Sequence, residues 1–147
     1  MKFIISTILF LSVIKSLQIT PLNLKISKAY LNDRDHIIIF LKEFIEVFHS
    51  YEDIYRSYLS EVDFKVYAEY IKKLENSLSK ITDENSKEIS DMIDDCIDEI
   101  DDAIDDYNDN PTKENFTIAI KLFERMFDKL FKILSVTSTN NMKVTLY

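Results

Sequence analysis

Apolar residues recur every three or four positions along most of this chain, and that period predicts helices. In residues 32–49 they cover about half the circumference of a helix, more than the usual apolar stripe. Such a helix is central in a bundle, lines a cavity or binds a partner. Two more helices are predicted to follow, capped by Ser50 with Asp53 and by Ser60 with Asp63.

The most acidic segment of the chain has the same helical period. Glu88 to Asn110 contains eleven Asp or Glu and no base, yet its apolar residues follow spacings of four, three, four, three and four. We therefore predict one long amphipathic helix, capped by Asn85, with the acids on its solvent flank rather than a disordered acidic tract. The apolar seam consists of Ile89, Ile93, Cys96, Ile100, Ala103 and Tyr107.

Metal binding by this acidic segment has only weak support in the sequence. Asp106, Asn108 and Asn110 have the spacing that opens an EF-hand loop. Pro111 stands where that loop needs Gly, and Thr117 where it needs a bidentate Glu, so no metal site is predicted. Weak Ca²⁺ association with neighbouring carboxylates remains an alternative.

A last helix is predicted to follow Pro111, with Asn110 as its cap. Its apolar face runs from Phe116 to Leu134, and the period is lost from Ser135, so residues 135–147 are predicted to be a loose tail. Residues 17–134 then form one domain. The fold class that these segments predict is all-α, a compact bundle of several short to medium amphipathic helices.

The composition excludes several classes of function. The chain of 147 residues has no Gly, which argues against glycine-rich phosphate loops and tight hairpins. Its net charge of −8 argues against nucleic acid as a partner. His36 and His49 have no neighbours that would orient them, and Cys96 is expected in the core. No catalytic residue, metal or cofactor is therefore predicted, and the protein is not expected to be an enzyme.

The N-terminal residues have the pattern of a secretory signal peptide. Lys2 precedes an apolar run from Phe3 to Ile14 that is too short to span a bilayer and ends near the small residue Ser16. We therefore predict a signal peptide over residues 1–16 and an extracellular protein. In a secreted chain, the sequence Asn-Phe-Thr at residues 115–117 makes Asn115 a predicted glycosylation site; otherwise it is a polar helix start.

The order of these features resembles one known family, the nematode fatty-acid- and retinol-binding proteins. From Leu31 to Leu74 the chain has a polar turn ending in Asp35, an apolar helix, an acid pair after Ser50 and then a Lys-x-Tyr ending at Tyr67. The run over residues 74–100 is similar to that family's next helices, where Ser-Leu precedes a polar break and an acidic helix. The likeness covers most of residues 17–134.

The resemblance implies a secreted, non-enzymatic carrier of fatty acids or retinoids, with an internal apolar cavity and transient membrane contact for ligand exchange. It also implies phosphorylation of Ser50, which Glu52 and Asp53 follow. The alternative is a secreted helical interaction protein whose apolar and heptad faces bind a partner protein or form a homodimer. We predict that the wall of this cavity is formed by aromatic residues on the apolar stripes, namely Phe44, Phe48, Phe123, Phe127 and Phe131.

Overall fold

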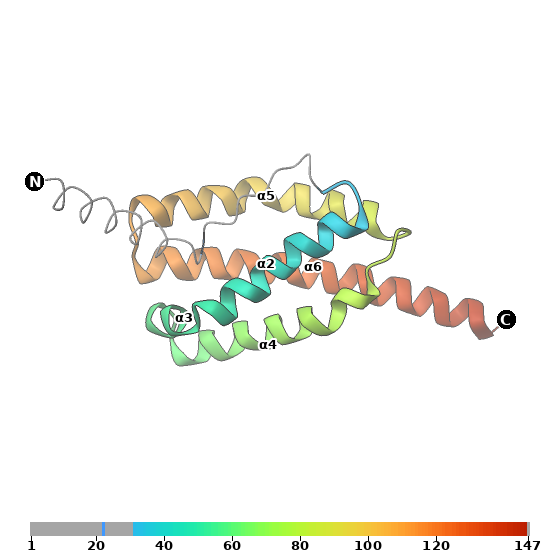
Figure 1. The fold of residues 1–147 in the computed structure, drawn as a ribbon, viewed down its shortest axis with the longest axis horizontal. Coiled ribbons are helices and arrows are strands. Elements are labelled where there is room, and N and C mark those ends of the chain that lie inside the picture. Colours follow the sequence, from blue (N-terminus) through green and yellow to red (C-terminus); the bar gives the residue numbers. More distant parts are fainter. Residues whose placement is uncertain (1–21, 23–30, 147) are drawn as a thin grey trace, which may run out of the picture.

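A computed structural model describes residue 22 and residues 31–146 of the chain, with side chains as far as residue 136. The predicted signal peptide at residues 1–16 lies outside the described residues. The described part contains helices and no strand, which confirms the all-α prediction (Figure 1). Its elements are α2 (Arg34–Ser50), α3 (Glu52–Tyr58), α4 (Glu61–Ser77), the 3₁₀ helix η3 (Leu78–Lys80), α5 (Ser86–Asp109) and α6 (Lys113–Leu146).

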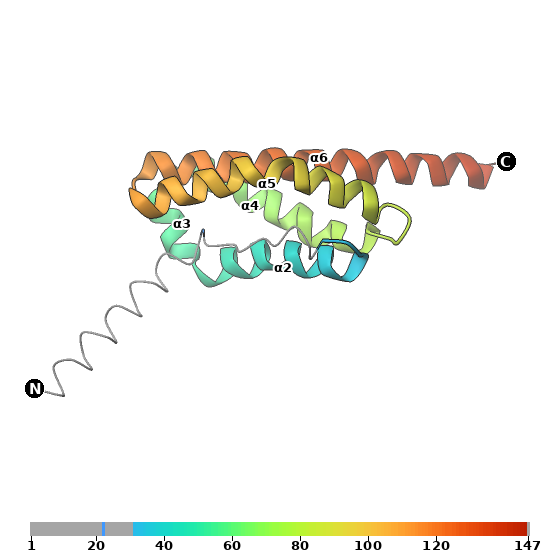
Figure 2. The same ribbon diagram turned by 90° about the horizontal axis from the view of Figure 1, so that it is seen from above.

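The four long helices form a bundle, and the short α3 closes one end of it (Figure 1). The neighbouring pairs are α2 with α4, α4 with α6, α6 with α5, and α5 with α2. Helices α2 and α6 therefore lie at opposite corners (Figure 2). Helices α4 and α6 run in the same direction, and α2 and α5 run the other way.

The apolar stripes meet in one continuous core between these helices. Phe44 of α2 reaches across the bundle, and its ring centroid lies 5.0 Å from that of Phe123 and 5.2 Å from that of Phe127, both on α6. Both contacts are edge-to-face, the favoured arrangement of aromatic rings. The wide stripes of α2 and α6 are thus used in full, because each of these helices packs on α4 and on α5 and also touches the other across the core.

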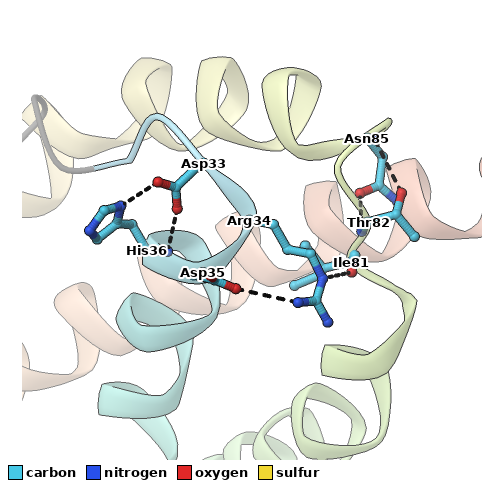
Figure 3. A network of polar contacts seen from close by, with 7 residues as sticks. All are labelled: Asp33, Arg34, Asp35, His36, Ile81, Thr82 and Asn85. Atoms are coloured by element: carbon cyan, nitrogen blue, oxygen red, sulfur yellow. Dashed lines mark hydrogen bonds and ion pairs between the residues drawn. The ribbon is translucent and has the colours of Figure 1, made fainter.

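Side-chain hydrogen bonds fix the connection between α4 and α5, which has no Gly (Figure 3). Asp33 caps the first turn of α2, and the Nε of Arg34 donates to the carbonyl of Ile81 at 2.8 Å. Asn85 was predicted to cap α5 and does precede it, but its Oδ1 accepts from the Thr82 N–H at 2.8 Å instead. The buried Asn85 side chain therefore holds the connection rather than the helix end.

One of the two predicted hydroxyl caps is confirmed. Ser60 accepts from the Asp63 N–H at 3.1 Å and begins α4. Ser50, in contrast, is the last residue of α2, and the prediction that it caps α3 is wrong. The N-cap of α3 is Tyr51, whose own N–H still donates to the Val47 carbonyl. Because that bond continues the α2 pattern, α3 starts one residue later than a Ser50 cap would require.

The beginning and the end of α6 also differ from the sequence prediction. Thr112 caps it by accepting from the Asn115 N–H at 3.1 Å, whereas Asn110 is the C-cap of α5. The helix then continues through Ser135 to Leu146, so the predicted loose tail over 135–147 is wrong for that stretch. Extending an existing helix needs no new nucleus, and no Gly or Pro follows Pro111 to interrupt it. Within the described helices, none has the length and hydropathy needed to cross a bilayer.

Candidate functional site

The seam between α4 and α6 contains several polar side chains that meet across it. Because the two helices are parallel and in register, residues 58 positions apart face each other across it. Lys121 Nζ lies 3.0 Å from Asp63 Oδ1, and the Tyr70 hydroxyl lies 2.9 Å from both carboxylate oxygens of Asp128. These contacts lie along the outer edge of the interface, where solvent reaches them.

Behind this edge lie two buried polar atoms that have no hydrogen-bond partner among the described residues. They are the hydroxyl of Tyr67 on α4 and the Oε2 of Glu124 on α6. Tyr67 is fully buried and Glu124 is 6% exposed. The other carboxylate oxygen of Glu124 lies 3.4 Å from Lys121 Nζ. An unsatisfied buried polar group typically costs about 1–3 kcal/mol, so both atoms are expected to have a use.

Burial shifts the titration of both groups. It raises the pKa of the Glu124 carboxyl; Lys121 opposes this shift, while Asp63 and Asp128 add to it. Burial also raises the pKa of Tyr67 well above its ordinary value, and the nearby Glu124 contributes. Tyr67 is therefore neutral over the physiological range and keeps a proton to donate.

Aromatic rings surround Tyr67. It stacks on Tyr55 with centroids 5.6 Å apart and planes 6° apart, and its ring also meets those of Phe48 at 5.6 Å and Phe127 at 6.3 Å. The Tyr67 hydroxyl thus lies within an apolar, aromatic interior, where a hydrogen bond is stronger than in water.

The structure brings the five predicted wall residues into this core. Phe48 and Phe127 flank Tyr67, and Phe44 joins Phe127 to Phe123. Phe131 lies farther along α6, stacked on Tyr70 at 6.4 Å, and is the most exposed of the five at 9%. All five are core residues, as their stripe positions predicted. Their role as a cavity wall stays a prediction.

A surface hollow lies at the start of α4 and α6, one helical turn from Tyr67. Its volume is about 680 Å³, within the range of small-molecule sites. Tyr58, Leu59 and Ile118 give it apolar walls, and Asp63 stands at its border. The Asp63–Lys121 ion pair therefore lies between this entry hollow, as we call it, and the buried atoms of Tyr67 and Glu124. The hollow is open to solvent, and the enclosed apolar cavity expected from the resemblance stays a prediction.

The acidic face of α5 is a solvent flank, as the sequence predicted. Its heptad seam is buried against α6, and the free Cys96 lies within it. Among the described residues, no group of three or more His, Cys, Asp or Glu is arranged to hold a metal ion. His36 pairs with Asp33 at 2.8 Å, and His49 pairs with Glu75 at 2.6 Å. The two histidines thus take part in separate surface contacts.

Two predicted modification sites lie at helix ends. Asn115 donates its Nδ2 to the carbonyls of Asn110 at 2.9 Å and of Asp106 at 3.4 Å, which closes the turn between α5 and α6. A glycan on this nitrogen would take the place of one of its two hydrogens, so the side chain could no longer donate one N–H to each carbonyl. Ser50 is exposed at the end of α2, and Glu52 and Asp53 follow it in α3. Glycosylation of Asn115 and phosphorylation of Ser50 stay predictions.

Glu124 is the site residue that the sequence analysis missed. It lies one turn after Ile120 and three residues before Phe127, inside the apolar stripe of the last helix. A single acid within such a stripe was a usable signal, because ionisable residues are rarely buried without a reason. Tyr67 entered the sequence analysis only as the end of the Lys-x-Tyr pattern, and nothing in its spacing indicated an unpaired hydroxyl.

Comparison of the chain with protein-family models, with curated proteins and with solved structures finds no match. The likeness to the nematode carriers therefore stays a resemblance in the order of sequence features. The functional argument depends on the geometry of the α4–α6 seam.

Proposed function

We propose that the protein is a non-enzymatic carrier of small apolar ligands that have one polar end. The observation that carries this proposal is the pair of unpartnered polar atoms, Tyr67 Oη and Glu124 Oε2, buried in an aromatic core beside the entry hollow. A ligand whose polar end reaches these atoms would satisfy both of them. Its apolar part would lie among the surrounding aromatic and aliphatic side chains.

The energetics of such binding need no catalytic group. Transfer of an apolar chain from water gains about 0.8 kcal/mol per CH₂. Much of that gain offsets the cost of association and ordering, so the polar anchor adds affinity and fixes the orientation. Fatty acids and retinoids, the ligands that the resemblance implies, both have this form. The acidic flank of α5 would keep a protein with such apolar helices soluble.

The alternative interaction protein has less support. The heptad seam of α5, which would have served a partner helix, is covered by α6 of the same chain. Among the residues whose side chains the structure describes, the exposed large apolar ones are spread over three helices and include Ile39 on α2, Val62 on α4 and Ile118 on α6. Single exposed apolar residues are normal on a soluble surface.

The test of the carrier proposal is displacement of an environment-sensitive fluorescent fatty acid from the purified protein, with oleate and retinol as competitors. Saturable binding near one-to-one, with competition by at least one of them, is the expected result. No saturable binding up to tens of micromolar, together with a stable dimer in solution, would favour the interaction protein.

Two matched variants locate the binding site. Tyr67→Phe removes only the unpartnered hydroxyl and should weaken competition by the better ligand about tenfold, the value of one hydrogen bond in an apolar site. Tyr70→Phe makes the same chemical change one turn along α4, at a hydroxyl that Asp128 already binds. It should leave the affinity unchanged. Equal effects of the two changes would place the ligand elsewhere.

A further inference from the structure

The charged groups around Glu124 give the buried end of the α4–α6 seam a negative balance. In the described structure, the ionised groups that act on it are Lys121, Asp63 and Asp128. Lys121 Nζ is shared between Asp63, at 3.0 Å, and Glu124, at 3.4 Å, and Asp128 binds the Tyr70 hydroxyl. The single ammonium is already in contact with two carboxylates, so it is a poor counterion for a third.

The two unpartnered atoms differ in the hydrogen bonds that they can form. Glu124 Oε2, as part of a carboxylate, can only accept a hydrogen bond, whereas the Tyr67 hydroxyl can donate or accept. A ligand hydroxyl fits both, because it donates its proton to Glu124 and accepts from Tyr67. A ligand carboxylate can accept from Tyr67, but it brings a second negative charge close to Glu124 in a site of low dielectric constant.

We infer that the site binds long-chain apolar alcohols in preference to the matching carboxylates, with the ligand hydroxyl between Tyr67 and Glu124. This inference rests on the proposed carrier function and narrows its ligand class. The alkyl part of the alcohol lies along the α4–α6 seam toward the entry hollow, where Leu59 and Ile118 supply apolar contacts. The Asp63–Lys121 ion pair, exposed to solvent, opens at small cost to admit it.

The experiment compares dodecanol, dodecanoate and dodecylamine as competitors of a neutral fluorescent probe at pH 7, each below the concentration at which it aggregates. The three share one alkyl chain and differ only in the polar end. Dodecanol should compete at a concentration about tenfold lower than dodecanoate, since the carboxylate leaves Glu124 unsatisfied. Dodecylamine, whose polar end is positively charged, tests whether the charge of the ligand's polar end alone decides the affinity.

Glu124→Gln provides the decisive variant. It removes the negative charge, keeps the shape and supplies an amide that can donate to a carboxylate. The ratio of dodecanoate to dodecanol affinity should move toward one. The matched control Glu99→Gln, on the exposed face of α5, removes the same charge away from the seam and should leave the ratio unchanged.

The outcomes separate this inference from the carrier proposal. Binding of alcohol and carboxylate with equal affinity, or an unchanged ratio in Glu124→Gln, overturns the alcohol preference while the carrier function stands. Tighter binding of dodecylamine than of dodecanol overturns the alcohol as the ligand class, because the negative balance around Glu124 would then select a cation. Failure of all three competitors and of the probe overturns the carrier function itself.

Discussion

Helix α6 takes part in two long seams whose chemistry is different. Toward α5 it packs on a regular apolar row that includes Ile93, Ile97 and Ile100, all nearly inaccessible to solvent. Toward α4 it meets an ion pair, a tyrosine–aspartate hydrogen bond and the unpartnered atoms of Tyr67 and Glu124. On its α5 side, α6 therefore has an interface that stabilises the fold. On its α4 side it has an interface in which two buried, unpartnered atoms lower the free energy of unfolding.

This difference suggests that the two seams have different roles in the protein. The α5–α6 seam has apolar residues inside and acids outside, and the one buried polar atom of α5 without a hydrogen-bond partner among the described residues, Asn108 Oδ1, lies near the end of that helix. The α4–α6 seam departs from that pattern at two adjacent places. Such departures cost stability, and they are expected at functional sites. The predictions below test whether the two seams respond to substitution in these opposite ways.

The largest effect is expected in the α5–α6 seam. Ile100→Ala should lower the free energy of unfolding by about 2–4 kcal/mol, because it removes buried methylene groups and leaves a cavity. Chemical denaturation followed by circular dichroism measures the change. Val62→Ala is the control, since Val62 is 70% exposed and its truncation should change stability by less than about 0.5 kcal/mol. Similar losses for both variants would contradict the described packing of α5.

A smaller effect of opposite sign is expected at Tyr67 in the α4–α6 seam. Tyr67→Phe removes a buried hydroxyl that has no hydrogen-bond partner within the described structure, so the ligand-free protein should be as stable as before or more stable by about 1 kcal/mol. Tyr70→Phe loses the bond to Asp128 and should be slightly less stable. A clear loss of stability in Tyr67→Phe would mean that its hydroxyl has a structural role, and the ligand anchor would lose its main support.

The smallest effect concerns Glu124 and pH. A carboxyl whose pKa is raised by folding binds its proton more tightly in the folded state, so its contribution to stability falls as pH rises from about 4.5 through the folded pKa. Glu124→Gln cannot titrate. The difference in unfolding free energy between variant and wild type should therefore shift in favour of the variant between pH 4.5 and pH 7. A difference that stays constant with pH would show that Glu124 is well solvated.

Most of the fold was predictable from the sequence, because the local preferences for helices and helix caps agree with the tertiary packing in most of the chain. The seam of α5 followed directly from its spacings, and the Ser60 cap from its hydroxyl and the acid three residues later. The errors occur at helix ends. Ser50 has the same capping signature as Ser60, but the chain there continues α2 for one more residue. At such boundaries the sequence offers two competing hydrogen bonds, and packing chooses between them.

The candidate site was less predictable than the fold. Phe44, Phe48, Phe123, Phe127 and Phe131 were nominated from their stripes, and all lie in the core. The polar residues that give the site its chemistry, Tyr67 and Glu124, are 57 positions apart in the sequence and were not paired by any motif. Their juxtaposition depends on α4 and α6 running parallel and in register, which no local pattern encodes.

The sequence by itself determined the helical class, the apolar faces and the acidic flank of α5, because these depend on the period of side chains along one helix. Only the tertiary structure decided that α6 meets α4 in parallel, that a tyrosine hydroxyl and a carboxylate oxygen are buried there without partners in the described part of the chain, and that the heptad seam is covered by α6. Hydrogen-bond satisfaction depends on which groups meet across an interface, and the order of residues along a single chain does not fix that by local rules.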